Sequence, residues 1–226
     1  LGERIDYSKK SDRPLPALKE TAEILRQLAS ALDYAHGHGV IHRDVKANNV
    51  MFDDHGTAFL VDFGIAKLLS KQTNALTQTG MTMGTPLYMA PEQWRGEDLT
   101  GTADQYALGV IAYSMLTGHM PFDGDTMYTV MHKHLNEAPP PLSKFRDDLP
   151  SSLDDVMDKV LAKGPNDRYA SAASFANAFA SAIEEHRDPP TRFFVTPLPP
   201  KPVKAPYMGS GTDLDGPTTT AESSPA

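Results

Sequence analysis

Two short apolar runs joined by a tight turn constrain this chain more than any other feature. Val50–Phe52 and Ala58–Val61 are rich in β-forming residues, and Asp53–Gly56 between them has the aspartates and glycine of a turn. The pattern predicts a β-hairpin. Because a hairpin holds its two ends side by side, we expect the polar segments His42–Asn49 and Asp62–Gly64 to emerge at the same edge.

The predicted hairpin brings four chemistry-bearing side chains together: Asp44, Lys46, Asn49 and Asp62. Carboxylate and amide oxygens suit Mg²⁺, which keeps few protein ligands and lets substrate phosphates complete its shell. Asn49 and Asp62 are therefore the candidate metal ligands. Asp44 remains to accept a proton, and Lys46 can place a point charge on a moving phosphoryl group.

At these residues the sequence resembles the protein kinases, and in particular the eukaryotic-like bacterial serine/threonine kinases. The run HRDVKANN (residues 42–49), followed by Asp62-Phe63-Gly64, is similar to their catalytic loop and metal-binding motif. The resemblance implies ATP and Mg²⁺ as cofactors and Asp44 as the catalytic base. It also implies protein substrates, and Lys46, two residues beyond Asp44, indicates Ser/Thr rather than Tyr acceptors. Ala47 stands where the family usually has Pro, which removes no functional group.

Two further residues of this loop are expected to act outside the reaction itself. His42 lies between two strand-like segments and is interpreted as a packed structural residue that holds backbone by hydrogen bonds, as the matching family His does. Arg43 is a cation beside the base. The resemblance implies an activation-loop phosphate as its partner, and an ordinary salt bridge is the alternative.

Residues 65–89 have no clear periodicity and are rich in Thr, which is typical of a functional or irregular segment. The run GTPLYMAPE (residues 84–92) resembles the substrate-facing loop and closing Ala-Pro-Glu of serine/threonine kinases. The segment is therefore interpreted as the activation loop, in which Thr77 and Thr79 match a paired phosphorylation site. The resemblance implies that Thr85 faces the substrate and contacts the catalytic Asp.

Helical periodicity predicts a mainly helical body, with helices at about 18–38, 103–116, 126–135, 152–163 and after Tyr169. The helix at 103–116 is apolar on nearly every face and is predicted to be the buried core helix. His36 and His38 lie near a glycine-terminated helix end. They are interpreted as partners of the helix dipole or as solvated side chains, and are given no functional role.

Three charged residues are expected to support the site. Asp104, in the first turn of the core helix, is expected to accept hydrogen bonds from the catalytic-loop backbone, as the matching family Asp does, or to complement the helix dipole. Arg168 resembles the family Arg that pairs with the Glu closing the activation segment, here Glu92. Such a pair is structural, and costly to break if buried.

Composition excludes several classes of protein. The net charge of −8 argues against nucleic acid as the main partner, and the absence of cysteine rules out disulfide frameworks and thiolate metal sites. The sequence has no apolar run near 18 residues, so a transmembrane span is not expected within it. These features fit a cytoplasmic domain. Because the chain opens on Leu1 without a basic-then-apolar leader, we expect it to be a piece of a longer protein.

The C-terminal segment changes character, with nine prolines in residues 187–226. Such a segment cannot bury enough apolar surface to offset its ordering entropy, so a disordered linker or tail is expected. Pro197–Pro202 can be read as a polyproline ligand for an SH3-like partner or as a plain extended spacer. Many family members join such a tail to a membrane span or sensor domain, so the parent protein can be membrane-anchored.

Together these patterns predict an α+β, protein-kinase-like fold: a mainly helical C-lobe (residues 1–186) with a small hairpin at the catalytic site, followed by the tail (187–226). The sequence shows no Gly-rich phosphate loop and no Val-Ala-Ile-Lys strand, so the nucleotide-clamping N-lobe is expected in the parent chain. The predicted function is an ATP-dependent protein serine/threonine kinase, inactive as this chain alone. A pseudokinase or binding scaffold is the alternative, against which the intact Asp44, Asn49 and Asp62 argue.

Overall fold

The computed structural model describes residues 1–2, 5, 15–63 and 86–187. They belong to one unit, Leu1–Pro190, whereas the second unit, Thr191–Ala226, lies outside the described residues. Thr77, Thr79 and Thr85 also lie outside them. The predicted domain boundary at residue 186 and the predicted tail therefore stay predictions.

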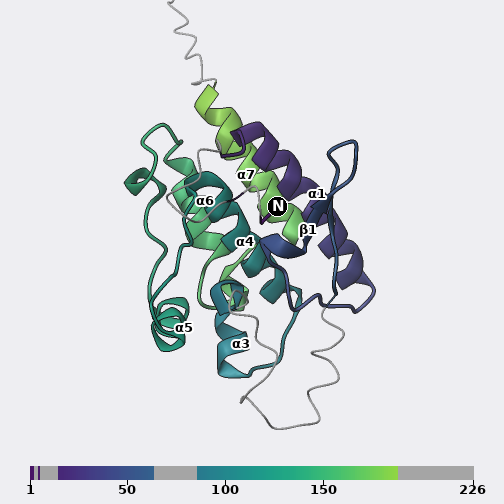
Figure 1. The fold of residues 1–226 in the computed structure, drawn as a ribbon, viewed down its shortest axis with the longest axis vertical. Coiled ribbons are helices and arrows are strands. Elements are labelled where there is room, and N and C mark those ends of the chain that lie inside the picture. The colour runs from purple at the N-terminus through teal and green to yellow at the C-terminus, as the bar shows by residue number, and fades with distance from the viewer. Residues whose placement is uncertain (3–4, 6–14, 64–85, 188–226) are drawn as a thin grey trace, which may run out of the picture. The chain divides into compact units, whose positions relative to one another are not determined.

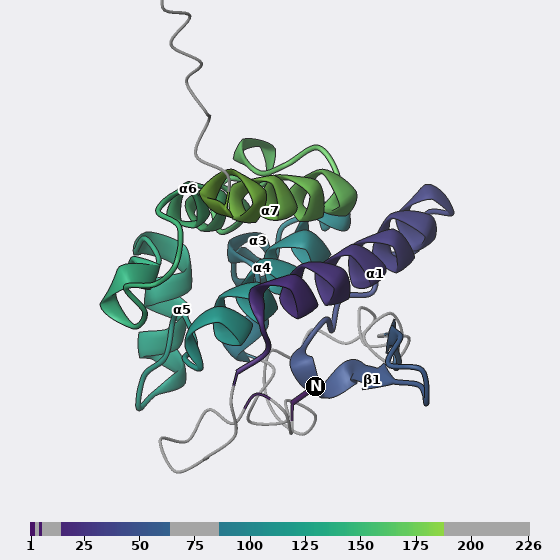
Figure 2. The same cartoon turned by 90° about the horizontal axis from the view of Figure 1, so that it is seen from above.

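Helices dominate the described residues, and the predicted α+β class with a small hairpin is confirmed (Figures 1 and 2). The α-helices are α1 (Leu18–Gly37), α3 (Pro91–Arg95), α4 (Gly101–Thr117), α5 (Met127–Asn136), α6 (Ser152–Val160) and α7 (Ala172–Arg187). Short 3₁₀ helices are η1 (Ala47–Asn49), η3 (Pro86–Tyr88), η4 (Leu142–Lys144) and η5 (Pro165–Asp167). The strands are β1 (Val50–Phe52) and β2 (Ala58–Leu60). None of the helices in these ranges is long and apolar enough to cross a membrane.

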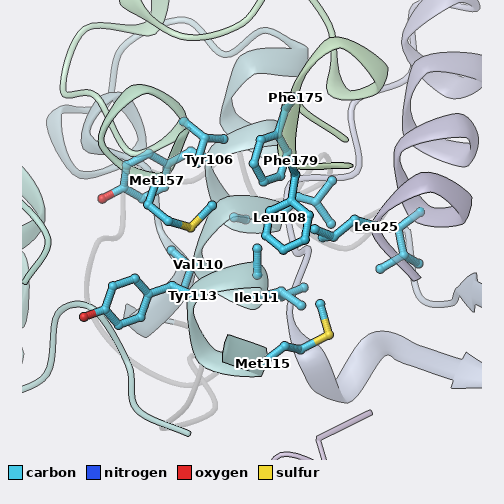
Figure 3. Packing of buried hydrophobic residues seen from close by; sticks show 14 of the residues in the cluster. Leu25, Tyr106, Leu108, Val110, Ile111, Tyr113, Met115, Met157, Phe175 and Phe179 are labelled. Carbon is cyan, nitrogen blue, oxygen red and sulfur yellow. The ribbon is translucent and has the colours of Figure 1, made fainter. Parts of the chain in front are cut away.

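Helix α4 is the central element of the core, as predicted. Every residue from Ala103 to Thr117 is buried. Side chains from three other helices pack around it: Leu25 of α1, Met157 of α6, and Phe175 and Phe179 of α7 (Figure 3). A helix that is apolar on all sides is stable in water only when neighbours cover all of it. Because α4 is held by packing on all sides, it can fix the position of the polar loops that contact it.

Helices α1 and α7 run alongside each other in both views (Figures 1 and 2) and form the most extensive helix–helix contact among the described elements. Asp33 of α1 joins them by a polar contact as well. Its two carboxylate oxygens accept hydrogen bonds from the backbone N–H groups of Ala172 (2.9 Å) and Ala173 (2.8 Å). The carboxylate thereby satisfies two amides of the first turn of α7 and complements the helix dipole.

The hairpin has the predicted antiparallel pairing, with Val50 opposite Leu60, Met51 opposite Phe59 and Phe52 opposite Ala58. Its turn is built as the sequence indicated, because Asp53 Oδ1 accepts hydrogen bonds from the backbone of His55 and Thr57. Gly56 has a φ of +82°, which glycine adopts without strain. Gln27 of α1 accepts a hydrogen bond from the Ala58 amide at 2.6 Å, which fixes the hairpin to the helical body.

Close packing of α4 on the C-terminal end of α6 depends on the absence of a side chain at Gly109. A Cβ there would lie 2.7 Å from Cγ1 of Val160 and 3.2 Å from Cδ2 of Leu161. We expect Gly109→Ala to lower the free energy of unfolding by about 1–3 kcal/mol, because an extra carbon overpacks the core. Urea titration of the chain measures this change. Val160→Ala in the same background should restore part of the loss, and a single variant more stable than the parent would contradict the prediction.

Candidate active site

The loop of residues 42–49, which resembles the catalytic loop of protein kinases, gathers three of the predicted side chains within six residues. Lys46 Nζ donates to Asp44 Oδ2 at 2.8 Å, and both side chains are 16% exposed. Asn49 Nδ2 donates to the Asp44 carbonyl oxygen at 2.9 Å and to Oδ2 at 3.3 Å. Helix η1 allows this by turning the chain between Lys46 and Asn49, whose backbone groups hydrogen-bond at 3.0 Å. The Asp44 carboxylate is thus oriented by one cation and one amide.

Asp62 reaches the same edge from the other end of the hairpin. The amide of Val61 donates to the Asn49 carbonyl oxygen at 2.9 Å, which continues the strand pairing by one residue on each side. Asp62 follows directly, is exposed, and has a φ of +58°. The predicted hairpin geometry therefore brings Asp62 next to Asn49.

The oxygens at this edge fit a hard cation. Nδ2 of Asn49 makes the hydrogen bonds to Asp44, so the amide oxygen is the atom of this side chain that could bind a cation, and Asp62 is exposed. Two protein oxygens are a usual share of a Mg²⁺ shell when phosphate oxygens and water supply the rest. Over the described ranges, no group of three or more His, Asp or Glu side chains could hold a metal alone. The donor set fits Mg²⁺ bound together with a phosphate group.

The backbone of the loop is fastened to α4 by Asp104, which is 1% exposed. Its Oδ2 accepts from the His42 amide at 2.7 Å, and its Oδ1 accepts from the Arg43 amide at 2.8 Å. Arg43 has a φ of +64°, a left-handed conformation that costs a non-glycine residue roughly 1–3 kcal/mol. Hydrogen bonds to a buried carboxylate offset that cost. The predicted contact is present, and Asp104 also lies in the first turn of α4, so both interpretations hold.

His36 makes a third contact with the same carboxylate. Its Nε2 lies 2.8 Å from Asp104 Oδ2, and its side chain is only 18% exposed. His36 is therefore not the solvated side chain that was one of the two predictions, although it does lie in the last turn of α1, as its interpretation as a dipole partner requires. Gly101 makes room for it, because a Cβ at that position would overlap the imidazole. His38 is exposed, with Nδ1 2.8 Å from the carbonyl oxygen of Tyr34, as expected near a helix end.

His42 has the structural surroundings that the sequence predicted. It is fully buried, its Nε2 lies 3.2 Å from the Val61 carbonyl oxygen, and its ring packs on Phe63 with centroids 4.4 Å apart. Burial lowers the pKa of the imidazole below its ordinary value, which outweighs the opposite effects of Asp104 and of the Val61 carbonyl. A neutral His42 joins the start of the loop to the segment that precedes Asp62.

Glu92 and Arg168 form a buried bidentate ion pair. Arg168 Nη1 and Nη2 donate to the two carboxylate oxygens at 2.7 and 2.8 Å, and the side chains are 0% and 2% exposed. Nε donates to the Ala162 carbonyl oxygen at 2.9 Å, and the guanidinium lies 4.8 Å from the Tyr106 ring centroid. The pair joins the start of α3 to the segment between α6 and α7, as the resemblance implied.

Gln93 is a bridge that the sequence analysis missed. Its Oε1 accepts from the Ala90 amide at 2.8 Å, and its Nε2 donates to the Arg43 carbonyl oxygen at 3.4 Å. A Gln three residues after a helix N-cap is a known capping position, so half of this arrangement had a local signal. The contact of Gln93 with the Arg43 carbonyl oxygen had no local signal in the sequence.

Known proteins are similar to this chain over most of its length. A family model described as "Protein kinase domain" matches residues 6–180. The chain belongs to the protein kinase family. This kinase chain is 42% identical to serine/threonine-protein kinase PknB of Mycolicibacterium smegmatis over 163 residues, which are 72% of this chain and 26% of that protein. It is 41% identical to serine/threonine-protein kinase PknA of Mycobacterium tuberculosis over 196 residues, 87% of this chain and 44% of that protein.

These relatives confirm the predicted resemblance to bacterial serine/threonine kinases. This kinase chain spans less than half the length of either relative. The roles of the individual site residues stay predictions. Thr77, Thr79 and Thr85 lie outside the described residues.

In this kinase chain we expect Glu92→Gln to lower the free energy of unfolding by about 3–5 kcal/mol, because the change leaves the buried Arg168 cation without its partner. Thermal and urea unfolding of the purified chain measure the loss. Glu23→Gln is the matched control, because Glu23 also contacts an arginine, Arg26, through both oxygens but on the surface. Equal destabilisation in the two variants would show that burial of the pair is not what matters.

Proposed function

We propose that this chain supplies the catalytic half of an ATP-dependent protein serine/threonine kinase. The observation that carries the proposal is the geometry around Asp44, whose carboxylate is held by Lys46 and Asn49 while Asp62 reaches the same edge. These groups match the parts that phosphoryl transfer needs: a base, a cation and two oxygen ligands. The bacterial relatives, which are named serine/threonine-protein kinases, support the same activity.

The residues divide the reaction between them. As the hydroxyl oxygen of a substrate Ser or Thr forms its bond to the γ-phosphorus of ATP, its proton passes to the Asp44 carboxylate. The bond from that phosphorus to the β–γ bridging oxygen breaks, and ADP leaves. Lys46, 2.8 Å from Asp44 Oδ2, stands where its charge can stabilise the transferring group. Asn49 and Asp62 would hold Mg²⁺, which when bound would neutralise phosphate charge.

The substrate class follows from the same loop. Lys46 lies two residues after Asp44, the arrangement that the resemblance connects with Ser/Thr acceptors. Because the reaction consumes ATP, we propose the cytoplasm as its location.

We expect Asp44→Asn in the full-length protein to lower kcat by roughly 10²–10⁴-fold while nucleotide affinity changes little, because the variant loses a positioned base. Asp62→Asn should instead weaken Mg²⁺-dependent nucleotide binding, because it loses a metal ligand. Steady-state phosphorylation of a Ser/Thr peptide and nucleotide titration with and without Mg²⁺ separate the two effects.

Asp54→Asn, at the exposed hairpin turn, is the control and should leave both quantities unchanged. The same loss of ATP binding in Asp44→Asn and Asp62→Asn, with no separate effect on kcat, would contradict the assignment of base and ligand. Activity that survives Asp44→Asn unchanged would favour a scaffold rather than an enzyme.

We propose that Thr77 and Thr79 are the activating phosphorylation sites of the parent kinase. A phosphate carries about −1.5 to −2 charge at pH 7 and can form charge-assisted hydrogen bonds with an arginine such as Arg43. The double variant Thr77→Ala/Thr79→Ala should therefore lose most of the activity, and mass mapping of autophosphorylated protein should find phosphate at these positions. Thr73→Ala/Thr82→Ala is the control within the same segment. Full activity in the Thr77/Thr79 variant would refute the switch.

A further inference from the structure

Helix α5 buries a histidine against the rest of the unit. Only Val130 and His134 are buried among its residues, and His134 has no exposed surface. Its ring lies among aromatic side chains from three segments, with centroids 4.8 Å from Phe122, 5.7 Å from Tyr106 and 6.5 Å from Trp94. A polar ring thus occupies a position that an apolar side chain would fill at lower cost, unless its nitrogens have partners.

One nitrogen of this ring has an evident partner. The hydroxyl of Tyr106, on α4, lies 2.8 Å from His134 Nδ1, and both groups are buried. The other nitrogen, Nε2, is buried without a hydrogen bond of standard geometry among the described residues. Helix α5 packs on η3, whose middle residue is Leu87.

The charge state of the ring follows from its surroundings. Burial lowers the pKa of His134 to about 3, and the ammonium of Lys163 acts in the same direction. Lys163 is close, since its Nζ lies 4.0 Å from the centroid of the Phe122 ring. The backbone of Leu87 has the opposite effect, which is the effect of a carbonyl oxygen near a ring nitrogen. His134 is therefore neutral and carries one ring proton.

The position of that proton decides what each nitrogen can do. If the proton is on Nε2, the Tyr106 hydroxyl can donate to Nδ1, and Nε2–H can donate toward the Leu87 carbonyl oxygen. If the proton is on Nδ1, Nε2 becomes an acceptor next to another acceptor, and a buried lone pair is left unsatisfied. The first arrangement gives Nδ1 a donor and directs the Nε2 proton toward an acceptor, whereas the second turns two acceptors toward each other.

We propose that His134 is a positioning residue that carries its proton on Nε2 and ties α5, through Tyr106 and the Leu87 carbonyl, to the segment that faces the protein substrate. The proposal rests on the proposed kinase function, because η3 begins directly after Thr85, the candidate substrate-facing residue. A fixed Leu87 backbone would set the place of the substrate peptide. It would leave the nucleotide side of the site, at Asn49 and Asp62, unaffected.

Three substitutions separate the two nitrogens. His134→Gln keeps an amide near the place of Nε2, His134→Asn keeps one near the place of Nδ1, and His134→Phe keeps neither. In the full-length protein, Asn and Phe should raise KM for a Ser/Thr peptide by about 3- to 10-fold, the worth of one buried hydrogen bond. KM for ATP and kcat should stay within about twofold, and Gln should lie nearer the parent than Asn does. His132→Asn, exposed on the same helix, should behave as the parent.

An unchanged peptide KM in His134→Asn and His134→Phe would overturn substrate positioning, as would a rise in KM for ATP of equal size. Nitrogen NMR of the imidazole in the unmodified 226-residue chain gives a second measurement that needs no activity. It should show a neutral ring protonated at Nε2 near pH 7, and protonation at Nδ1 would overturn the proposed contacts. If the unmodified full-length protein transfers no phosphoryl group, the proposed function fails and substrate positioning with it. The NMR result still decides the hydrogen bond.

Discussion

The carboxylate of Asp104 is the interaction on which the site depends. It lies at the start of a helix that is buried from Ala103 to Thr117, so its position is set by the core rather than by any loop. Backbone amides of His42 and Arg43 and the ring of His36 all reach it. Such a group is expensive to bury alone and stabilising when its lone pairs are satisfied. The packing of α4 therefore determines where Asp44 lies, because Asp104 holds the backbone of His42 and of Arg43, whose φ is +64°.

Polar contacts hold the other side of the same loop. Gln93 reaches the carbonyl oxygen of Arg43, and its neighbour Glu92 is locked to Arg168 without exposure to water. The backbone of Arg43 thus has its N–H held by α4 and its C=O held by α3. Because both partners sit on elements that are themselves buried or ion-paired, the catalytic loop has few ways to relax. We interpret the buried charges as specifying one arrangement of the loop, a role attested for buried polar groups in some proteins.

The features that could be predicted from the sequence involve residues close together along the chain, whereas the features that were missed involve contacts between residues far apart along it. The hairpin, η1 and the convergence of Asp44, Lys46 and Asn49 follow from turn residues and spacings within about twenty positions, so local patterns were enough. The apolar run of α4 was by itself enough to predict that this helix is buried. His36 was misjudged because its partner lies 68 residues away, and nothing at a glycine-rich helix end distinguishes a solvated imidazole from a paired one. His134 and Asp33 were missed for the same reason. Contacts of this kind depend on how the helices pack against one another, and the periodicity of a sequence does not indicate which helices will be neighbours.

The Asp33 contact with the start of α7 has a consequence for how the protein is made. Asp33 caps amides 139 and 140 residues later in the chain, and α1 finds its most extensive packing surface on that same helix. During synthesis, α1 leaves the ribosome long before α7 does, and domains generally complete folding as units. Until α7 has emerged, the leucines of α1 lack part of the surface against which they pack, and Asp33 has no amides to cap. The unit therefore closes late, and the interval before closure is when a nascent chain most needs protection from aggregation.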